Sequence, residues 1–254
     1  MLVRALRCSR LLLRSGPPRR GRLLARHQRS LLLEWTAEGE SARELCWLLD
    51  PGLGLSPRAC SCPPLRLEVD CSPTLRWQGT RLELGSGLAL ELDGAELWEP
   101  LWQPRGHRRR AMSAPIGSLS SVIQPVADGL GGGPPRRAAL VALLGLGLGS
   151  TPEGDDLLIG LRAAWQLRRH LGDEVPLGLV DEVLAEAGPA DTHPVSLQGL
   201  HDARAGFYPE ALARCLDALS GEGDLEPSLG ALLALGGSSG RALGFGVWRG
   251  WTWP

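Results

Sequence analysis

Residues 145–160 read Gly145-Leu-Gly147-Leu-Gly149-Ser150-Thr151-Pro152-Glu153-Gly154-Asp155-Asp156-Leu-Leu-Ile-Gly160, the densest run of conformational signals in the chain. Thr151 is a favoured N-cap residue, and Pro152 suits the first helical position because its missing N–H would be unpaired there. The acidic residues that follow complement the positive end of a helix. Apolar residues then recur at helical spacing as far as about Leu171, so the stretch predicts a helix that begins behind a glycine loop.

This glycine loop has two functional interpretations and one purely structural one. Free N–H groups at a helix start can bind an anion such as phosphate or carboxylate. Asp155 and Asp156 would repel an anion unless a hard cation lies between them, so a metal-bridged phosphate or a polar substrate held by carboxylates would reconcile the two features. In the structural interpretation, the acids only complement the helix dipole and the glycines only allow close packing.

The composition is that of a globular protein large enough for one or two domains. The chain has 254 residues, 43% of them hydrophobic, and a formal net charge of -1, so it lacks the basic excess of a nucleic-acid binder. It contains neither lysine nor asparagine, a bias that resembles a GC-rich bacterial coding sequence. The absence of lysine excludes Schiff-base lysines and the Walker A loop. No apolar run is long enough for a membrane span.

Cysteine, histidine and serine give no strong catalytic signal. We expect the cysteines to be reduced, mostly buried thiols in a cytoplasmic protein, with a metal or disulfide role as the alternative. The histidines lack metal-ligand spacing, so no metal site is predicted, and no cofactor is identified. Ser150 and Ser239 lack the G-x-S-x-G context of a hydrolase nucleophile, and His193 and His201 are in no sequence context that fixes a triad. The cysteines are Cys8, Cys46, Cys60, Cys62, Cys71 and Cys215.

Patterning divides the chain into a β-rich first part and a helical second part. We expect an α+β protein with a basic, partly disordered N-terminus (1–29), an antiparallel β-rich domain (30–104), a basic linker (105–112) and a mainly helical domain (113–254). The N-terminus has the alternatives of a transit peptide or a basic arm. Strands are expected at 30–35, 65–69, 75–77, 81–84 and 88–92, with a short helix at 41–49. Helices are expected at 117–127, 136–144, 179–187, 195–205, 209–219 and 228–235.

A second glycine loop near the end of the chain is similar to the first. Residues 154–160 and 240–246 share the frame G-x-x-L-x-x-G, and each follows an apolar helical pattern that ends in glycine. The similarity predicts two related helix-loop-helix units whose loops face one pocket. Chance similarity in a chain rich in Gly and Leu is the alternative.

Residues 147–160 resemble the G-x-G-L-T-P-S-G-D-D-x-L-x-G signature of a bacterial family that carries a domain-of-unknown-function label. That family includes a subunit associated with the oxamate carbamoyltransferase of anaerobic allantoin breakdown. Thr192, Ser196 and Leu200, followed by Ala203 and Gly206, resemble a further segment of the family. The second loop resembles a G-H-T-S-G-x-D-x-L-x-G element but departs from it, because Gly237 stands in place of the histidine and Ala242 in place of the aspartate.

The resemblance implies a role in carbamoyl transfer between oxalurate, phosphate and oxamate, as one subunit among others, with a small carboxylate or phosphate as ligand. The alternative is a non-catalytic small-ligand-binding or scaffolding protein that has lost activity. In that case Trp248, Trp251 and Trp253 would contact a partner, or would simply pack in the core. The expected catalytic residues are Asp155 and Asp156, and the expected ligand-binding residues are Gly147, Gly149, Ser150, Thr151, Gly154, Ser238, Ser239 and Gly240.

Overall fold

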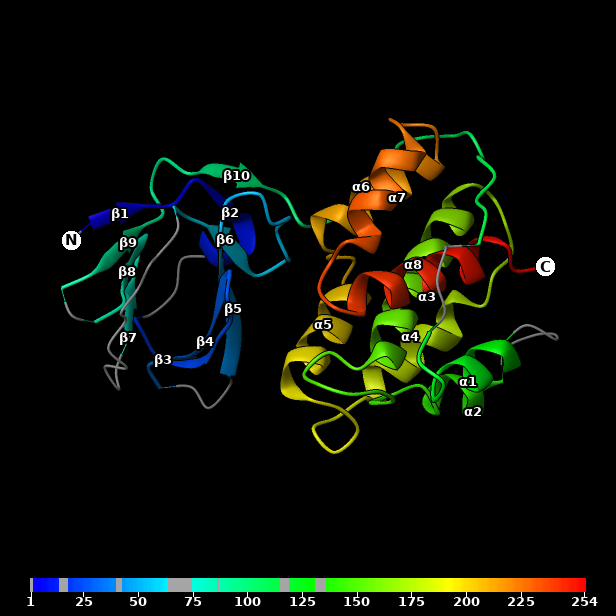
Figure 1. Cartoon of the computed structure of the whole chain (residues 1–254), viewed down its shortest axis with the longest axis horizontal. Helices are drawn as coiled ribbons and strands as arrows, with labels where there is room; N and C mark the ends of the chain where they lie inside the picture. The colour runs from blue at the N-terminus through cyan, green and yellow to red at the C-terminus, as the bar shows by residue number, and fades with distance from the viewer. Residues whose placement is uncertain are drawn as a thin grey trace. The chain divides into compact units, whose positions relative to one another are not determined.

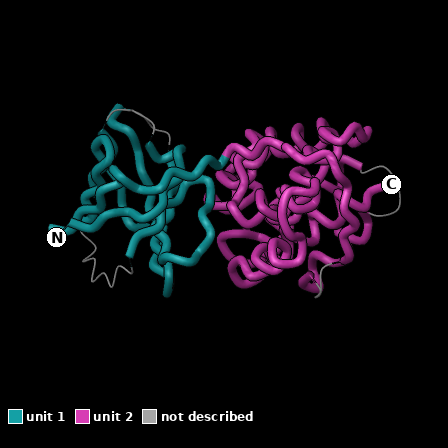
Figure 2. The backbone as a smooth tube through the Cα atoms, turned by 90° about the horizontal axis from the view of Figure 1, so that it is seen from above, with its two compact units in different colours: residues 1–100 teal, residues 101–254 magenta. Residues whose placement is uncertain are grey.

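The chain forms two compact units, each described here by itself. The computed structural model describes residues 2–13, 18–39, 43–63, 75–85, 87–114, 119–130 and 136–254. Unit 1 is Met1–Pro100 and unit 2 is Leu101–Pro254 (Figure 2). Strands fill the first unit and helices the second, which confirms the α+β class (Figure 1).

Unit 1 is built around one curled ten-stranded sheet. The strands lie in the order β1-β9-β8-β7-β3-β4-β5-β6-β2-β10. Their bounds are β1 Leu2–Arg4, β2 Arg7–Ser9, β3 Arg19–Arg26, β4 Ser30–Ala37, β5 Arg43–Leu49, β6 Ala59–Ser61, β7 Leu75–Gln78, β8 Arg81–Glu83, β9 Ala89–Glu91 and β10 Glu96–Trp98, with a 3-10 turn at Arg10–Leu13.

The two ends of this sheet are formed by neighbouring stretches of chain. β1 and β2 are consecutive in sequence yet lie at opposite ends of the strand order, where they pair in parallel with β9 and β10 respectively. The Leu6 amide donates to the Ser61 carbonyl, and the Glu96 amide donates to the Leu6 carbonyl. Because β5 and β6 are also parallel, the sheet is mixed, whereas the sequence predicted an antiparallel one.

The prediction of a helix at 41–49 is wrong. Residues 43–49 form β5, which pairs with β4 in antiparallel register from Ser30↔Leu49 to Thr36↔Arg43. This pairing buries Cys46 and Leu48 beside Leu33 and Trp35 in the core of unit 1, a gain that outweighs the helix propensity of the segment. Trp35 has room because Gly21 lies against it: a Cβ atom at Gly21 would be 2.4 Å from the Trp35 ring.

Other expectations for unit 1 agree with the strands or fall outside the described residues. The strands expected at 30–35, 75–77, 81–84 and 88–92 correspond to β4, β7, β8 and β9. The strand expected at 65–69 and Cys71 lie outside the described residues, and the described part of 1–29 contains β1, β2 and β3. The remaining five cysteines are free and buried, as expected, and burial raises the pKa of the Cys8 and Cys46 thiols to about 12.

Unit 2 contains eight helices within the described residues. They are α1 Gln124–Gly129, α2 Arg137–Val141, α3 Glu153–His170, α4 Leu177–Glu186, α5 Pro194–Arg204, α6 Glu210–Leu219, α7 Leu225–Leu233 and α8 Ser239–Trp251. α3 is the central helix: its side chains are buried on every face from Gly154 to Trp165. A helix buried all round belongs to the interior of a domain, which explains why most residues of this stretch are apolar and why its charged residues, Asp155, Asp156 and Arg162, are buried as well. In the described residues no helix is both long and apolar enough to cross a bilayer.

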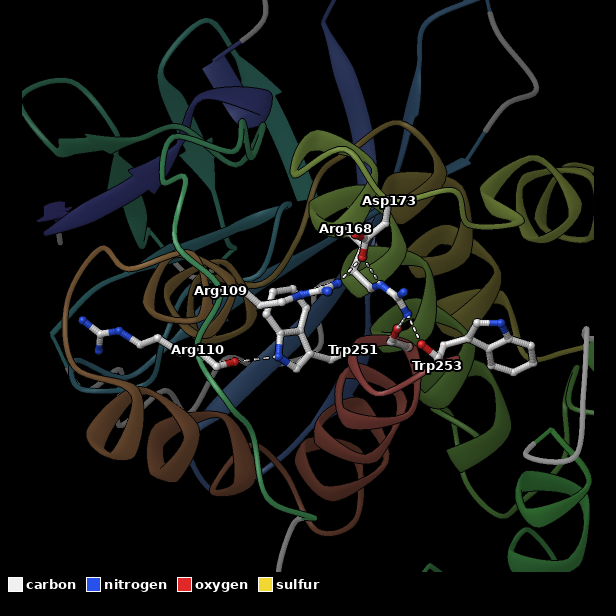
Figure 3. A network of polar contacts seen from close by, with 7 residues as sticks. Arg109, Arg110, Arg168, Asp173, Trp251 and Trp253 are labelled. Atoms are coloured by element: carbon white, nitrogen blue, oxygen red, sulfur yellow. Dashed lines mark hydrogen bonds and ion pairs between the residues drawn. The ribbon is translucent and has the colours of Figure 1, made fainter.

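The C-terminal end of α3 is tied to the chain that follows α8. The buried Arg168 guanidinium donates to the Gly250 and Trp253 carbonyl oxygens at 3.1 Å and 2.6 Å, and it pairs with Asp173 at 2.6 Å (Figure 3). The tryptophans Trp251 and Trp253 are 6% and 9% exposed, so both belong to the core of unit 2. The Arg168 guanidinium can be buried here because Asp173 balances its charge and the carbonyl oxygens accept hydrogen bonds from its N–H groups.

The segment 105–112, expected as a basic linker, runs along helices of unit 2. The Arg108 and Arg110 amides donate to the Ser220 and Leu219 carbonyls at the C-terminal end of α6, and the Trp251 indole donates to the Arg110 carbonyl at 2.8 Å (Figure 3). A Cβ atom at Gly106 would lie 2.1 Å from the Ser220 carbonyl oxygen. These contacts give the segment a fixed path over unit 2.

Candidate functional site

The first glycine loop has backbone conformations that residues with a side chain rarely adopt. Gly145, Gly147 and Gly149 have φ angles of 66°, 126° and 87°. A Cβ atom at Gly145 would lie 2.1 Å from the Asp191 carbonyl oxygen, and one at Gly147 would lie 2.8 Å from the Glu153 nitrogen. Positive φ and close backbone approach therefore both require glycine at these two positions, and the loop is held against α3 and the segment before α5.

Helix α3 begins one residue later than predicted and without the predicted cap. Pro152 occupies the N-cap position, the first helical residue is Glu153, and no side chain caps the helix. Thr151 instead directs its hydroxyl toward the second loop, where Thr151 Oγ1 lies 3.0 Å from Ser239 Oγ. The interpretation of Thr151 as a cap is wrong because a hydroxyl partner from a distant segment replaces the helix amides.

Three amides at the start of α3 already have acceptors. The Gly154 amide donates to the Leu146 carbonyl at 2.9 Å, and the Asp155 and Asp156 amides donate to the Pro152 carbonyl at 3.1 Å and 3.2 Å. An anion site at a helix start depends on amides that point toward the ligand. This helix start therefore offers a ligand its side chains more than its backbone.

Asp155 holds three segments together. It is fully buried and accepts hydrogen bonds from the Gly145 amide at 2.9 Å, from the Ser196 hydroxyl at 2.6 Å and from the Thr192 hydroxyl. These donors come from the glycine loop and from the start of α5, so the carboxylate fixes both relative to α3. A carboxylate that accepts from this many donors on separate segments acts here as a structural residue.

Asp156 lies next to Asp155 but in a different environment. It is 7% exposed, and its Oδ2 atom has no hydrogen-bond partner within the described part of the chain. The pKa of this carboxyl is raised to about 7, mainly by burial and also by the neighbouring Asp155 and Glu153, while the nearby Ser239 hydroxyl lowers it in part. Near neutral pH the Asp156 carboxyl is therefore present in both its protonated and its ionised form.

The second glycine loop repeats the packing of the first. A Cβ atom at Gly154 would lie 2.0 Å from the Leu143 carbonyl oxygen, and one at Gly240 would lie 2.2 Å from the Leu232 carbonyl oxygen. The backbone of each helix start thus packs closely against the end of the preceding helical segment. Ser238 is the N-cap residue of α8 and makes no side-chain cap, and Ser239 is its first helical residue.

Helices α3 and α8 contact each other through reciprocal glycines. A Cβ atom at Gly160 would lie 2.2 Å from the Leu243 carbonyl oxygen, and one at Gly246 would lie 2.2 Å from the Leu157 carbonyl oxygen. These four residues are the Leu and the second Gly of the two G-x-x-L-x-x-G frames, so the internal similarity in sequence corresponds to a local two-fold relation in space. The helix pair places the two helix starts side by side (Figure 1).

The two starts differ in their polar groups. In the shared frame, Asp156 of α3 corresponds to Ala242 of α8, which is fully buried. Gly237 is exposed, and a Cβ atom there would have nothing within 4 Å. The positions that depart from the family pattern therefore leave the second loop without an acid, and the two buried carboxyls at the helix starts, Asp155 and Asp156, both belong to the first.

The candidate residues do not all come together. Thr151 and Ser239 lie within hydrogen-bond distance of each other, Ser239 lies near enough to Asp156 to lower its pKa, and Gly154 and Gly240 position the two helix starts. Gly149 is exposed with open space around it, and Ser150 and Ser238 are half-buried at the edge of the two loops. His193 accepts from the Val195 amide at 3.2 Å and so caps α5. Within the described residues, no three His, Cys, Asp or Glu side chains gather as a metal site would require.

Sequence reasoning from local patterns missed Thr192 and Ser196 as partners of Asp155. The two residues were singled out only through the family resemblance, because they follow Asp155 by 37 and 41 positions. A Thr-x-x-x-Ser spacing at a helix start places both hydroxyls on one side, which is the signal that could have identified them.

Residues 143–251 match the family model described as oxamate carbamoyltransferase subunit AllH. This segment belongs to the AllH family. The AllH segment contains both glycine loops and both helices of the reciprocal pair, together with Thr192 and Ser196. No curated protein and no solved structure matches the chain significantly. The AllH assignment ties the chain to an oxamate carbamoyltransferase subunit, and the word subunit implies further subunits.

Proposed function

We propose that this chain is a subunit of an oxamate carbamoyltransferase-type assembly and contributes a polar-ligand pocket where its two glycine loops meet. The observation that carries the proposal is the extent of the AllH match, which covers both loops and the helix pair behind them. The reaction class is carbamoyl transfer between oxalurate, phosphate and oxamate. The ligand at the pocket is a small carboxylate or phosphate.

The side chains at the junction suit such a ligand. Thr151 and Ser239 supply two hydroxyls that can donate or accept, and Asp156 supplies a carboxyl that is neutral for part of the time near pH 7. A neutral carboxyl does not repel an anion and can donate a hydrogen bond. We assign Asp156, rather than the fully bonded Asp155, as the residue that interacts with the ligand, and Asp155 as the residue that holds the loop.

The proposal is tested in the native host with a tagged full chain. Gentle purification, identification of the co-purifying proteins and an assay for phosphate-dependent release of carbamoyl phosphate from oxalurate provide the readouts. We expect stable partners and activity in the eluate. The Asp156→Asn variant should keep the partners and lose activity, whereas the exposed Asp224→Asn variant should keep both. A solitary, inactive wild-type chain would contradict the proposal.

The second candidate is a non-catalytic subunit that binds a small ligand or serves as a scaffold. Two features favour it: Asp155 accepts three structural hydrogen bonds, and the Gly154, Asp155 and Asp156 amides at the start of α3 already have acceptors. Under this alternative, the purified assembly is active and the Asp156→Asn variant remains equally active. The same experiment therefore separates the two candidates.

A further inference from the structure

Unit 1 has a cavity on the solvent-facing side of the hairpin formed by β7 and β8 (Figure 1). The cavity has a volume of about 330 Å³, at the low end of the range for small-molecule sites. It is lined by Arg76, Gln78, Arg81 and Glu83. Because it lies outside residues 143–251, the AllH match does not bear on it, and its ligand has to be inferred from its own side chains.

The strand geometry places the four lining side chains on one face of the hairpin. Successive side chains of a strand point to opposite faces of a sheet. The alternate residues of β7 and β8 face the core of unit 1 and are at most 4% exposed; they are Leu75, Trp77, Leu82 and Leu84. The backbone beneath the cavity is therefore held in place by the core, and the lining side chains are exposed to solvent.

The strand register determines which charges in the cavity are balanced. Arg76 lies opposite Glu83, and Gln78 lies opposite Arg81. The Glu83 carboxylate forms an ion pair with Arg81 at 3.9 Å. On the other side of β8, the register of β9 places Glu91 opposite Arg81. Arg81 therefore has a carboxylate partner within its own strand and a second carboxylate on the neighbouring strand.

Arg76 is the arginine whose charge is not balanced. Its side chain is exposed and makes no hydrogen bond or ion pair in the part of the chain that the structure describes. The register places Arg20 of β3 opposite Arg76, and Arg20 already pairs with Glu38 at 3.3 Å. Like charges directly opposite each other destabilise a sheet. An anion bound at Arg76 would reduce this repulsion.

We propose that this cavity binds a small monocarboxylate that also carries a neutral N–H donor, such as an amide. The ligand carboxylate accepts hydrogen bonds from the Arg76 guanidinium and the Gln78 amide, which lie two residues apart on the same face of β7. The Glu83 carboxylate accepts a hydrogen bond from the N–H group of the ligand. The inference is independent of the pocket proposed in unit 2.

The charge of the lining selects this class of ligand. Two arginines and one glutamate give the cavity a net charge of +1, which a monoanion balances and a doubly charged phosphate exceeds. A ligand with an ammonium group in place of the amide would have no net charge to offer the unbalanced arginine. The glutamate repels a carboxylate with no donor group beside it, so the N–H group is what makes the whole lining complementary to the ligand.

NMR titration of the ¹⁵N-labelled full chain with oxamate and, separately, with pyruvate tests the inference. The two probes have the same shape and the same carboxylate, but oxamate has an amide NH₂ group where pyruvate has a methyl group. We expect oxamate to shift the backbone amide resonances of residues 75–84. Pyruvate should bind there about fivefold more weakly, because it lacks the hydrogen bond to the carboxylate of the cavity.

Two variants and one control isolate the contributions of the lining residues. Arg76→Gln should weaken the binding of both probes about tenfold, because it removes the charged donor for the carboxylate. Glu83→Val removes the N–H acceptor, so oxamate and pyruvate should bind to it equally. Arg22→Gln changes an exposed arginine of the same sheet that pairs with Glu34 at 2.7 Å, and it should leave both dissociation constants unchanged. All three substituted side chains are exposed, so each variant should fold.

The outcomes separate this inference from the pocket proposed in unit 2, which residues 145–160 and 239–246 report. Shifts confined to those residues would overturn the cavity in unit 1 and leave the other pocket in place. Equal binding of the two probes by the wild type, or equal effects of Arg76→Gln and Arg22→Gln, would also overturn it. Shifts at residues 75–84 that follow the expected order of probes and variants would support it, whatever happens in unit 2.

Discussion

The two glycine loops of unit 2 share one packing arrangement but differ in chemistry. Gly160 and Gly246 make the same contact, each against a carbonyl of the other helix, at the same distance. The first loop adds two buried carboxyls, whereas the second places the exposed Arg241 and the buried Ala242 at the corresponding positions. The comparison separates the glycine contacts that hold the helix pair together, which both loops supply, from the buried carboxyls, which only the first loop supplies.

The glycine contacts should be the most sensitive to substitution. Gly160→Ala and Gly246→Ala each place a Cβ atom 2.2 Å from a backbone carbonyl oxygen, so the helices must separate. We expect each to lower the free energy of unfolding by about 4 kcal/mol or more, beyond the usual cost of overpacking. Chemical denaturation measures the loss, and similar losses in both variants would support the two-fold relation. Gly237→Ala, in open space, should change it by less than about 0.5 kcal/mol.

Asp156 should make stability depend on pH. Its carboxyl has a pKa of about 7 in the folded chain, above the value of 3.8 for a free carboxyl. Because the folded state binds the proton more tightly, its contribution to stability is complete below pH 4 and is lost as the pH rises to 7 and beyond. The loss should be on the order of 4 kcal/mol, and Asp156→Asn should remove this part of the profile. Denaturation between pH 4 and pH 8 tests this expectation; identical profiles for both proteins would contradict it.

Asp155→Asn should lower the stability of the folded chain at pH 7, in contrast to Asp156→Asn. Asp155 accepts hydrogen bonds from three donors. An Asn side chain would replace one acceptor oxygen by an NH₂ group, which faces these donors and cannot accept from them. We expect a loss of about 2 kcal/mol at pH 7, since hydrogen bonds to charged groups contribute about 1.5 to 3 kcal/mol. Thermal unfolding of the two variants side by side measures the contrast. Equal melting temperatures would show that the two aspartates are equivalent after all.

The hydroxyl contact between the loops should matter least to stability. Thr151→Val keeps the shape of the side chain and removes its hydrogen bond to Ser239. We expect a loss of about 1 kcal/mol or less in the free energy of unfolding, together with weaker binding of the proposed ligand. A large loss of stability would mean that Thr151 serves the fold rather than a ligand.

Local signals predicted the elements of this site but not their partners. The glycines, the start of α3 and the matching frame of α8 follow from short-range sequence rules, and the structure has all three. The division of roles between Asp155 and Asp156 could not be predicted. Adjacent acids look alike in sequence, and the donors that distinguish them lie 37 to 41 residues away for Asp155.

The errors have the same origin. Thr151 has the sequence context of an N-cap, but Ser239, 88 residues further along, is its partner. Residues 41–49 have helix-compatible composition, but their pairing with β4 makes them a strand. In both places, a contact between distant segments outweighed a local preference that was itself correctly identified.

The reciprocal glycine contact also determines when this domain can be completed during synthesis. Thr151 and Ser239 are 88 residues apart, so α3 leaves the ribosome long before the helix that covers its glycine face. At about 5 to 20 residues per second, that face stays uncovered for roughly 4 to 18 s, which is long compared with helix formation. The helix at the centre of unit 2 is therefore exposed to chaperones and to neighbouring nascent chains for seconds before α8 packs against it.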